Sequence, residues 1–453
     1  MNYTPNIIQD EEGSALASVL IIVIIISLFI GVVLSGIYLQ NRFIQQDINE
    51  VKARYAAEAG VYTFLNEYPY QSVINDTTFT FRDQDSTEIT IRASAYGGFM
   101  NIHSTAEVQG KKKIIRILAG VGKSDAFQNA VVLGDTNSVL MLTGSTQLKG
   151  DALTGQEGTQ TTDFKGRPFS GDIEGELNRE SGYLLPLFDA TFLEHQEAHF
   201  SNLLENGQLR TFLSNYDGMA EVNAEPKDTL FFEESISWSS GDSISFPRDL
   251  TIVINGNAII NGNYHFGVFT KLIVRDTLMA GGNISGENML IYAGKSLQIG
   301  GGAELSTQAI SGNDIIIRDQ AYLRYPSMLY TSQEFAAERQ EIIIDIRDQA
   351  MVDGTIIYPV QSSNFTSGLF RVRVADQAVV RGGIYTLGQT ELEGKVLGSV
   401  LTHQFYFYES PSSYINWLKD AEIDLSGRPE NYVIPLGFSE HPEYQILDWF
   451  EVE

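Results

Sequence analysis

IIIRDQA, residues 315–321, ends a run of β-branched side chains with a short polar turn. The same unit returns as IDIRDQA at 344–350 and as VRVADQA at 372–378, spaced 29 and then 28 residues apart. Strand–turn units that recur in this way are typical of a parallel β-helix, in which each coil buries its apolar face against the next. We therefore predict a mainly β chain whose body is a right-handed parallel β-helix (β-solenoid). A β-sandwich would fit the strand density but not the repeated unit.

Other short β-branched runs, each closed by Gly, Asn or Asp, extend this pattern from about residue 125 and lie at 130–134, 251–256, 271–276 and 289–294. An amphipathic helical pattern interrupts the runs between Pro186 and Gly218. We expect this helix to cover one end of the solenoid, because open strand edges need protection. The aromatic residues Trp417, Trp449 and Phe450 are expected to close the other end.

The N-terminal region predicts one retained membrane anchor. No charged residue occurs between Gly13 and Asn41, and residues 19–34 read VLIIVIIISLFIGVVL. A helix of this length can span roughly 30 Å of hydrocarbon. A cleaved secretory signal would instead have a basic leader and a shorter apolar core. Here the leader, residues 1–13, holds three acidic residues and no Lys or Arg.

The helical pattern continues beyond the apolar stretch. Apolar residues recur at spacings of three and four in an amphipathic pattern that includes Phe43, Ile44, Ile48, Val51, Tyr55, Val61, Tyr62 and Leu65. A single helix from Ser14 to Leu65 would be about 78 Å long. Within it, the small residues of the run Ala56-Ala57-Glu58-Ala59-Gly60 would let another backbone approach closely.

This N-terminus resembles those of type IV minor pilins and of the pseudopilins of type II secretion. The resemblance lies in Gly13-Ser14 before the apolar helix, in the run from Arg54 to Gly60, and in a partial match at 97–105 and 110–116. It implies that a prepilin peptidase cuts between Gly13 and Ser14 and methylates the new N-terminus. It also implies that the helix packs with the helices of other pilin-like or pseudopilin subunits in a filament core. The chain would then be an inner-membrane protein with an extracytoplasmic body.

Two features depart from the family pattern. Major pilins carry Glu five residues after the cut, where this chain has Ser18; an unpaired charge there would be costly in the membrane. The difference favours a minor or tip position, or a chain that stays outside the filament. The leader is acidic, and Arg42, Lys52 and Arg54 follow the span, which by the positive-inside rule would place the body in the cytoplasm. The resemblance outweighs this small charge bias.

The predicted organisation follows from these changes of pattern. It comprises a leader (1–13), a long helix (14–67, with its membrane span at about 15–39), a small β region (68–122), the start of the solenoid (123–185), the helical insertion (186–218), the main β-helix (219–407) and a C-terminal cap (408–453).

Composition excludes several functions. The 57 acidic and 30 basic residues give a net charge of −27, so we expect no nucleic-acid partner. The absence of cysteine excludes disulfides, Cys-ligated metal sites and cysteine nucleophiles.

Candidate chemistry is confined to a ladder of repeat-unit carboxylates formed by Asp276, Asp319, Asp348 and Asp376. Paired carboxylates could cleave a glycan, and oxygen-lined turns could bind a cation. Because an arginine precedes most of these residues, we expect structural turns instead. His195 and His199 share a helix face, but Gln196 stands where a zincin motif needs Glu. We assign no catalytic residue, metal or cofactor, and we interpret Lys111-Lys112-Lys113 as a solvated hairpin turn.

The sequence thus favours a non-enzymatic structural protein of a pilus or secretion filament, displaying an acidic β-helix for assembly, capping or adhesion to a glycan or surface protein. The alternative is a surface-tethered protein that binds or cleaves polysaccharide.

Overall fold

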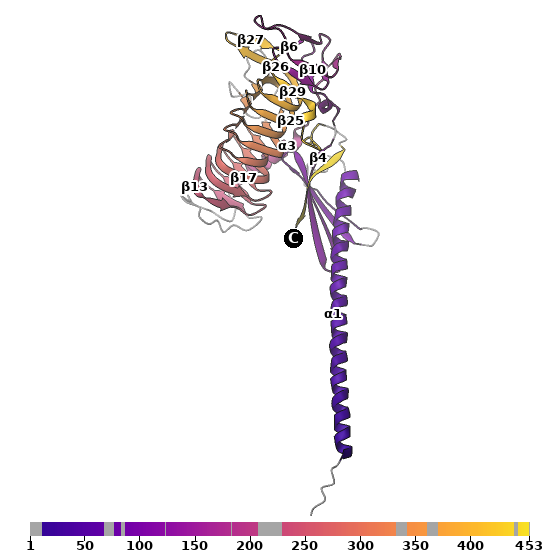
Figure 1. The fold of residues 1–453 in the computed structure, drawn as a ribbon. Coiled ribbons are helices and arrows are strands. Elements are labelled where there is room, and N and C mark those ends of the chain that lie inside the picture. The colour runs from indigo at the N-terminus through magenta and orange to yellow at the C-terminus, as the bar shows by residue number, and fades with distance from the viewer. Residues whose placement is uncertain are drawn as a thin grey trace, which may run out of the picture.

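The computed structural model describes residues 11–67, 77–82, 87–122, 124–182, 184–206, 229–331, 342–359, 370–438 and 443–452. They form a long helix, a small antiparallel sheet and a parallel β-helix placed beside the far end of that helix (Figure 1). The predicted fold class is therefore confirmed: the chain is mainly β, with a solenoid body and a long apolar N-terminal helix. Of the predicted leader, residues 1–10 lie outside the described residues.

Helix α1 (Glu11–Glu67) runs without interruption for 57 residues. Its large apolar side chains from Leu16 to Leu39 are exposed in the isolated chain. Within the part of the chain that the structure describes, this is the one helix long and apolar enough to cross a membrane. Its C-terminal third packs on the small sheet.

The small sheet is five-stranded and antiparallel, in the order β1-β2-β3-β4-β30. Its strands are β1 (Thr77–Arg82), β2 (Glu88–Tyr96), β3 (Phe99–Val108), β4 (Lys111–Val121) and β30 (Tyr444–Val452). Alternating residues of β2 to β4, such as Ile89, Ile102 and Ile117, are fully buried in one cluster with Val61 and Phe64 of α1. The period of two in these strands thus covers the apolar stripe of the helix.

The solenoid has three parallel faces. Face A contains β12 (Thr229–Phe232), β14 (Thr251–Ile254), β16 (Lys271–Val274), parts of β17 (Thr277–Ala293), β19 (Glu304–Ser311), β21 (Tyr322–Thr331), β23 (Met351–Tyr358), β25 (Val379–Leu392) and β26 (Lys395–Glu409), then β5 (Val131–Leu133), β8 (Ala152–Thr154) and β11 (Leu177–Arg179).

Face B contains the first part of β13 (Ile236–Ser245), β15 (Ala258–Phe266) and β17, then β18 (Ser296–Ile299), β20 (Asp314–Ile317), β22 (Ile342–Ile346), β24 (Phe370–Val374) and the end of β25. Three short strands continue it at the far end: β28 (Trp417–Lys419), β6 (Leu140–Thr143) and β9 (Thr159–Thr161). Face C takes the remaining parts of the long strands, then β29 (Glu422–Asp424), β7 (Gln147–Lys149) and β10 (Asp172–Glu174); β27 (Ser412–Ile415) forms a hairpin with β26.

The order of coils in space differs from their order in the sequence. Strand β5, in the first coil along the chain, pairs in parallel with β26, in the last long coil, through Val131↔Val400 and Val132↔Leu401. The coils built by residues 131–179 therefore stack beyond the last coil, and the chain must return along the solenoid to begin again at β12.

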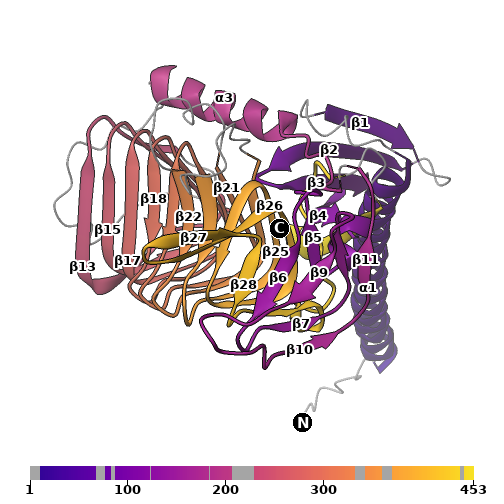
Figure 2. The ribbon, with the colours of Figure 1, turned by 90° about the horizontal axis from the view of Figure 1, so that it is seen from above.

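Helix α3 (Thr191–Asn206) lies on this return path, along the side of face A (Figure 2). Its Phe192, Leu193 and Phe200 are buried, and the Phe200 ring centroid lies 5.2 Å from that of Tyr292. The prediction that the helical insertion (186–218) caps one end of the solenoid was therefore wrong for its described part, residues 186–206; residues 207–218 lie outside the described residues. The reason is an outward-facing apolar ladder on face A, which runs through the paired residues Phe231, Val253, Ile273, Tyr292, Ile310, Tyr330, Ile357, Tyr385, Leu401 and Val132 and needs a cover along its length.

The C-terminal segment also departs from the prediction. Trp417 packs against Phe164 at the far end of the solenoid, with ring centroids 5.8 Å apart, as a closing residue should. Trp449 and Phe450 do not close that end: they lie on β30, which pairs with β4. The Trp449 ring contacts Tyr62 of α1. The solenoid is thus inserted between two neighbouring strands of the small sheet.

One buried ion pair joins the sheet to the solenoid. Arg116 on β4 pairs with Asp249, which precedes β14, and the two side chains are 6% and 20% exposed. The Arg116 guanidinium also lies 3.2 Å from the ring centroid of Phe269 and donates to Asn101 Oδ1 at 2.8 Å. Because such a charge is costly to bury alone, these contacts hold the two parts in one relative position.

We expect Arg116→Met to lower the free energy of unfolding by about 3–5 kcal/mol, because it leaves Asp249 largely buried without its partner. The matched control is Arg82→Met, which removes the exposed Arg82–Glu88 pair and should cost less than about 1 kcal/mol. Urea unfolding of both variants checks this, and equal effects would show that the junction pair contributes no more than a surface pair.

Candidate functional site

The first candidate site is the part of α1 beyond the uncharged stretch, because it is apolar on two opposite sides. Ala53, Ala57 and Phe64 are buried against the sheet. A second set, which we call the outer stripe, is 42–65% exposed and consists of Ile44, Ile48, Val51, Tyr55 and Tyr62. Spacings of three, four and seven residues place the outer stripe along one line of the helix, on the side away from the buried residues; at its end, Tyr62 also contacts Trp449 of the edge strand β30. The sequence pattern had grouped these residues with Val61, which the structure places on the sheet side.

The small-residue run from Ala56 to Gly60 packs mainly against the chain's own sheet. Ala56, Ala57 and Gly60 face the sheet, and a Cβ atom on Gly60 would clash with Ser104 Oγ and lie 2.7 Å from Ile89 Cγ2. The close neighbours of this run are therefore side chains of strands β2 and β3, Ile89 and Ser104, and not the backbone of another subunit's helix. Glu58 pairs with Arg54 at 3.1 Å, and Ala59 remains exposed.

The predicted processing residues Gly13 and Ser14 lie in the first turn of α1.

The second candidate site is the solenoid edge between faces B and C, where the RDQA units form tight turns. Ala321 N donates to Arg318 O, and Ala350 N donates to Arg347 O, both at 3.0 Å. Both central residues have left-handed backbones, with φ of 53° and 64° at Asp319 and Gln320. This is the pattern of a type I′ turn, and aspartate is among the side chains that tolerate it best. Asp348 and Gln349 repeat it with φ of 55° and 63°.

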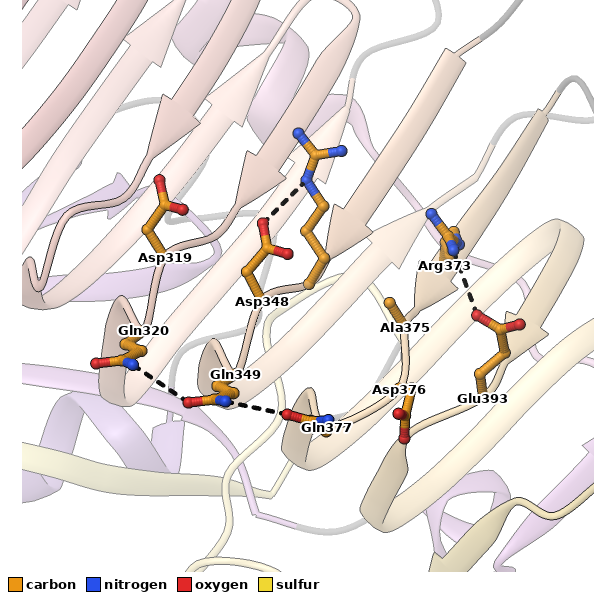
Figure 3. A pocket seen from close by; sticks show the side chains of 10 residues that line it. Asp319, Gln320, Asp348, Gln349, Arg373, Ala375, Asp376, Gln377 and Glu393 are labelled. Carbon is orange, nitrogen blue, oxygen red and sulfur yellow. Dashed lines mark hydrogen bonds and ion pairs between the residues drawn. The ribbon is translucent and has the colours of Figure 1, made fainter.

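A polar groove of about 830 Å³ runs along these turns (Figure 3). Its floor includes a ladder of side-chain amides: Gln320 donates to Gln349 at 3.2 Å, and Gln349 donates to Gln377 at 3.0 Å. Asp319 and Asp348 lie on successive coils and pair with the arginine of their own unit, Arg318 at 3.5 Å and Arg347 at 3.6 Å. The exposed Asp376 continues the edge.

Asp276 does not belong to this edge, so the predicted four-residue ladder was wrong at that position. It lies between β16 and β17, in a turn from face A to face B, and pairs with Lys295 at 2.7 Å. The short motif Arg-Asp resembles the repeat, but without the following Gln-Ala it forms a different turn of the coil.

The sequence reading missed an ion-pair ladder on the outer side of face B. Register places Asp345 beside Arg373 and Arg373 beside Glu391, on three successive coils. Arg371 lies 2.8 Å from Glu391, and the side chains of Asp345 and Glu391 are 6% and 11% exposed. Burial raises the pKa of Asp345 and of Glu391, although the neighbouring arginines act in the opposite direction. The sequence signal that could have predicted this ion-pair ladder is the alternation of arginine and apolar residues in β24.

These groups can bind polar ligands but do not form a metal centre. The groove offers amide, carboxylate and guanidinium groups on a regular spacing of about 4.8 Å per coil, which suits hydrogen bonding to an extended polar chain. Among the described residues, no group of three His, Asp or Glu side chains is arranged to hold a metal ion.

The histidine pair of α3 is likewise not brought into a zinc site. The intervening Gln196 instead clamps the β2–β3 turn, accepting from Gly97 N at 2.8 Å and donating to Gly97 O at 2.9 Å. This polar contact docks α3 on the small sheet.

Comparison with known proteins finds distant similarity. No model of a known protein family matches the chain. The LPS-assembly protein LptD of Chromobacterium violaceum is 25% identical over 188 residues, which cover 36% of this chain and 23% of that protein. The crystal structure of the competence-associated pilin ComZ from Thermus thermophilus aligns over 89% of this chain and 97% of that chain, at 11% identity and a TM-score of 0.20. Neither match assigns the chain to a family.

The turn geometry makes a prediction about the edge. Asp348→Val should lower the free energy of unfolding by about 1–3 kcal/mol, because a β-branched residue fits a left-handed backbone poorly. Asp376→Val is the matched control, since Asp376 occupies the same place in its unit without a left-handed backbone, and it should cost less than about 0.5 kcal/mol. Thermal unfolding of both variants tests this prediction. Equal losses of unfolding free energy would mean that the left-handed backbone at Asp348 does not explain the preference for aspartate there.

Proposed function

We propose that the chain is a structural subunit of a membrane-anchored filament of the type IV pilin or pseudopilin class. The observation that carries the proposal is the two-sided apolar character of α1: one side packs on the chain's own sheet, and the outer stripe faces away from it. Large apolar residues in a continuous exposed line mark an interaction surface.

The spacing of the outer stripe favours a helix as its partner. Ile44, Ile48, Val51 and Tyr55 follow one another by four, three and four residues, the spacing with which one helix packs along another. The stripe continues the apolar span, so a partner helix could follow α1 from the membrane outwards. Subunits that pack in this way form a filament with helices inside and globular parts outside.

The finer assignments belong to the same proposal. A prepilin peptidase removes residues 1–13, the body lies outside the cytoplasm, and Ser18 places the subunit at a minor or tip position. The solenoid serves assembly, capping or adhesion and carries no catalytic group, because Asp319 and Asp348 are each held by an arginine of their own turn. The polar groove along the edge supports an alternative role in binding polysaccharide.

We expect the double variant Ile48→Gln, Val51→Gln to fold normally but to lose assembly, with at least about a tenfold drop in recovered cross-linked oligomers, because it removes two central contacts of the outer stripe. The measurement is membrane cross-linking in cells, with the unfolding midpoint of the purified protein as the folding check. Ile259→Gln, Met279→Gln is the matched control, since these solenoid residues are similarly exposed, at 45% and 39%. Normal assembly of the stripe variant would refute the proposed helix interface.

We expect the intact mass of the membrane protein to correspond to 440 residues, because removal of 13 from 453 leaves that number. Gly13→Leu should leave the full-length chain, and Gly31→Leu, a control within the same helix, should leave processing unchanged. Full-length wild-type protein in a host with an active prepilin peptidase would contradict the assignment.

A further inference from the structure

The membrane-proximal end of the small sheet is a basic hairpin tip. Gln109 and Gly110, with φ of 50° and 78°, form the tight turn between β3 and β4, and Lys111, Lys112 and Lys113 follow. A two-residue turn with left-handed residues keeps the tip narrow and rigid. The lysines therefore extend from the sheet at a defined place.

Two contacts set the height of this tip along α1. Lys113 Nζ lies 2.7 Å from Glu50 and 2.9 Å from Glu451, which ties the start of β4 to the helix and to β30. A groove of about 860 Å³ is lined by Val108 and Gln109 of the tip together with α1 residues from Gln45 to Ala59. The start of β4 is thus level with Glu50, and the groove beside the tip extends along the helix as far as Gln45.

This height is the level of lipid headgroups. The uncharged stretch of α1 ends at Asn41; Gln45 lies about 6 Å and Glu50 about 14 Å farther along the helix, and an extended lysine side chain spans roughly 6 Å of that distance. The polar layer of a bilayer is roughly 5–8 Å thick on each side of the hydrocarbon core. With α1 across a membrane, the hairpin tip reaches the headgroups of the leaflet from which the helix emerges.

The charge at this level differs from that of the rest of the chain. Lys111 and Lys112 have no ion-pair partner among the described residues, and Arg42 and Lys52 lie exposed on α1 at the same end. The acidic groups nearby are Asp47, Glu107, which faces Lys112 across the hairpin, and Glu50 and Glu451, which Lys113 binds. The five basic residues therefore outnumber these four acidic ones, although the whole chain carries a net charge of −27.

We propose that Lys111 and Lys112 bind the phosphate groups of anionic phospholipids and dock the small sheet on the membrane surface. Arg42 and Lys52 contribute to the same contact from α1. The proposal rests on α1 spanning a bilayer, which is part of the proposed function. A helix alone would let the body tilt and rotate; a second contact point, together with repulsion between the acidic solenoid and the anionic surface, gives the body one orientation.

The test uses the full-length chain in lipid nanodiscs, made of phosphatidylcholine alone or mixed with phosphatidylglycerol, each with a nitroxide on some of the headgroups. Because the chain has no cysteine, Val108→Cys gives one site for a fluorescent bimane label beside the tip. Ile25→Cys reports insertion of the span through protection from aqueous iodide. Ser413→Cys reports the distant hairpin of β26 and β27 and should show no headgroup quenching in any sample.

We expect headgroup quenching at position 108 to be several times stronger in the anionic discs and to fall to the neutral-disc value in molar salt. Each lysine near an anionic surface contributes roughly fivefold to the docked population, so Lys111→Gln, Lys112→Gln should remove most of the difference. The control variant Lys165→Gln, Lys295→Gln changes two exposed solenoid lysines. It should keep the difference in quenching between anionic and neutral discs.

Equal quenching in the two lipid compositions, or an unchanged signal in the Lys111→Gln, Lys112→Gln variant, would overturn the docking proposal and leave the filament function standing. Iodide access at position 25 would instead show that α1 is not inserted, which overturns the anchor as well.

Discussion

The antiparallel pairing of β30 with β4 is the constraint on which the rest of the structure depends. The chain leaves the small sheet at Val121 and returns to it at Tyr444, and these two residues are register partners. All of the solenoid lies between them. Both ends of the insertion must therefore lie close together, and the parallel pairing of β5 with β26 satisfies this condition by stacking the first coils beyond the last.

The same constraint explains why face A is buried on both sides. A parallel sheet with both faces covered requires nearly continuous apolar strands, as in β14 and β16. The inner side fills the solenoid, and the outer ladder forms a second core with α3, the small sheet and α1. Arg116 and Asp249 cross this boundary, and their burial makes a specific relative position of sheet and solenoid more favourable than a sliding apolar contact.

The molecule has a different surface chemistry at each level from the membrane outwards. An apolar helix is followed by a helix segment that carries the outer stripe, with the basic hairpin tip beside the start of that segment, and finally by an acidic solenoid. In the proposed function, hydrophobic burial acts on the apolar helix and the outer stripe, attraction to anionic headgroups acts on the hairpin tip, and mutual repulsion acts between solenoids. Under that proposal, one chain is held in a membrane and oriented on it while its large body stays in water.

The sequence by itself determined the element types: the long apolar helix, the β-helix and the RDQA turns follow from periodicity, because apolar spacing and turn residues act locally. The tertiary structure decided the contacts between distant residues, which no local sequence pattern specifies. The partner of β30, the position of α3 along face A, the separation of Asp276 from Asp319, and the pairing of Arg116 with Asp249 all join residues distant in the chain. Their choice depends on which apolar surfaces remain uncovered once the coils have stacked, and that is a property of the assembled molecule.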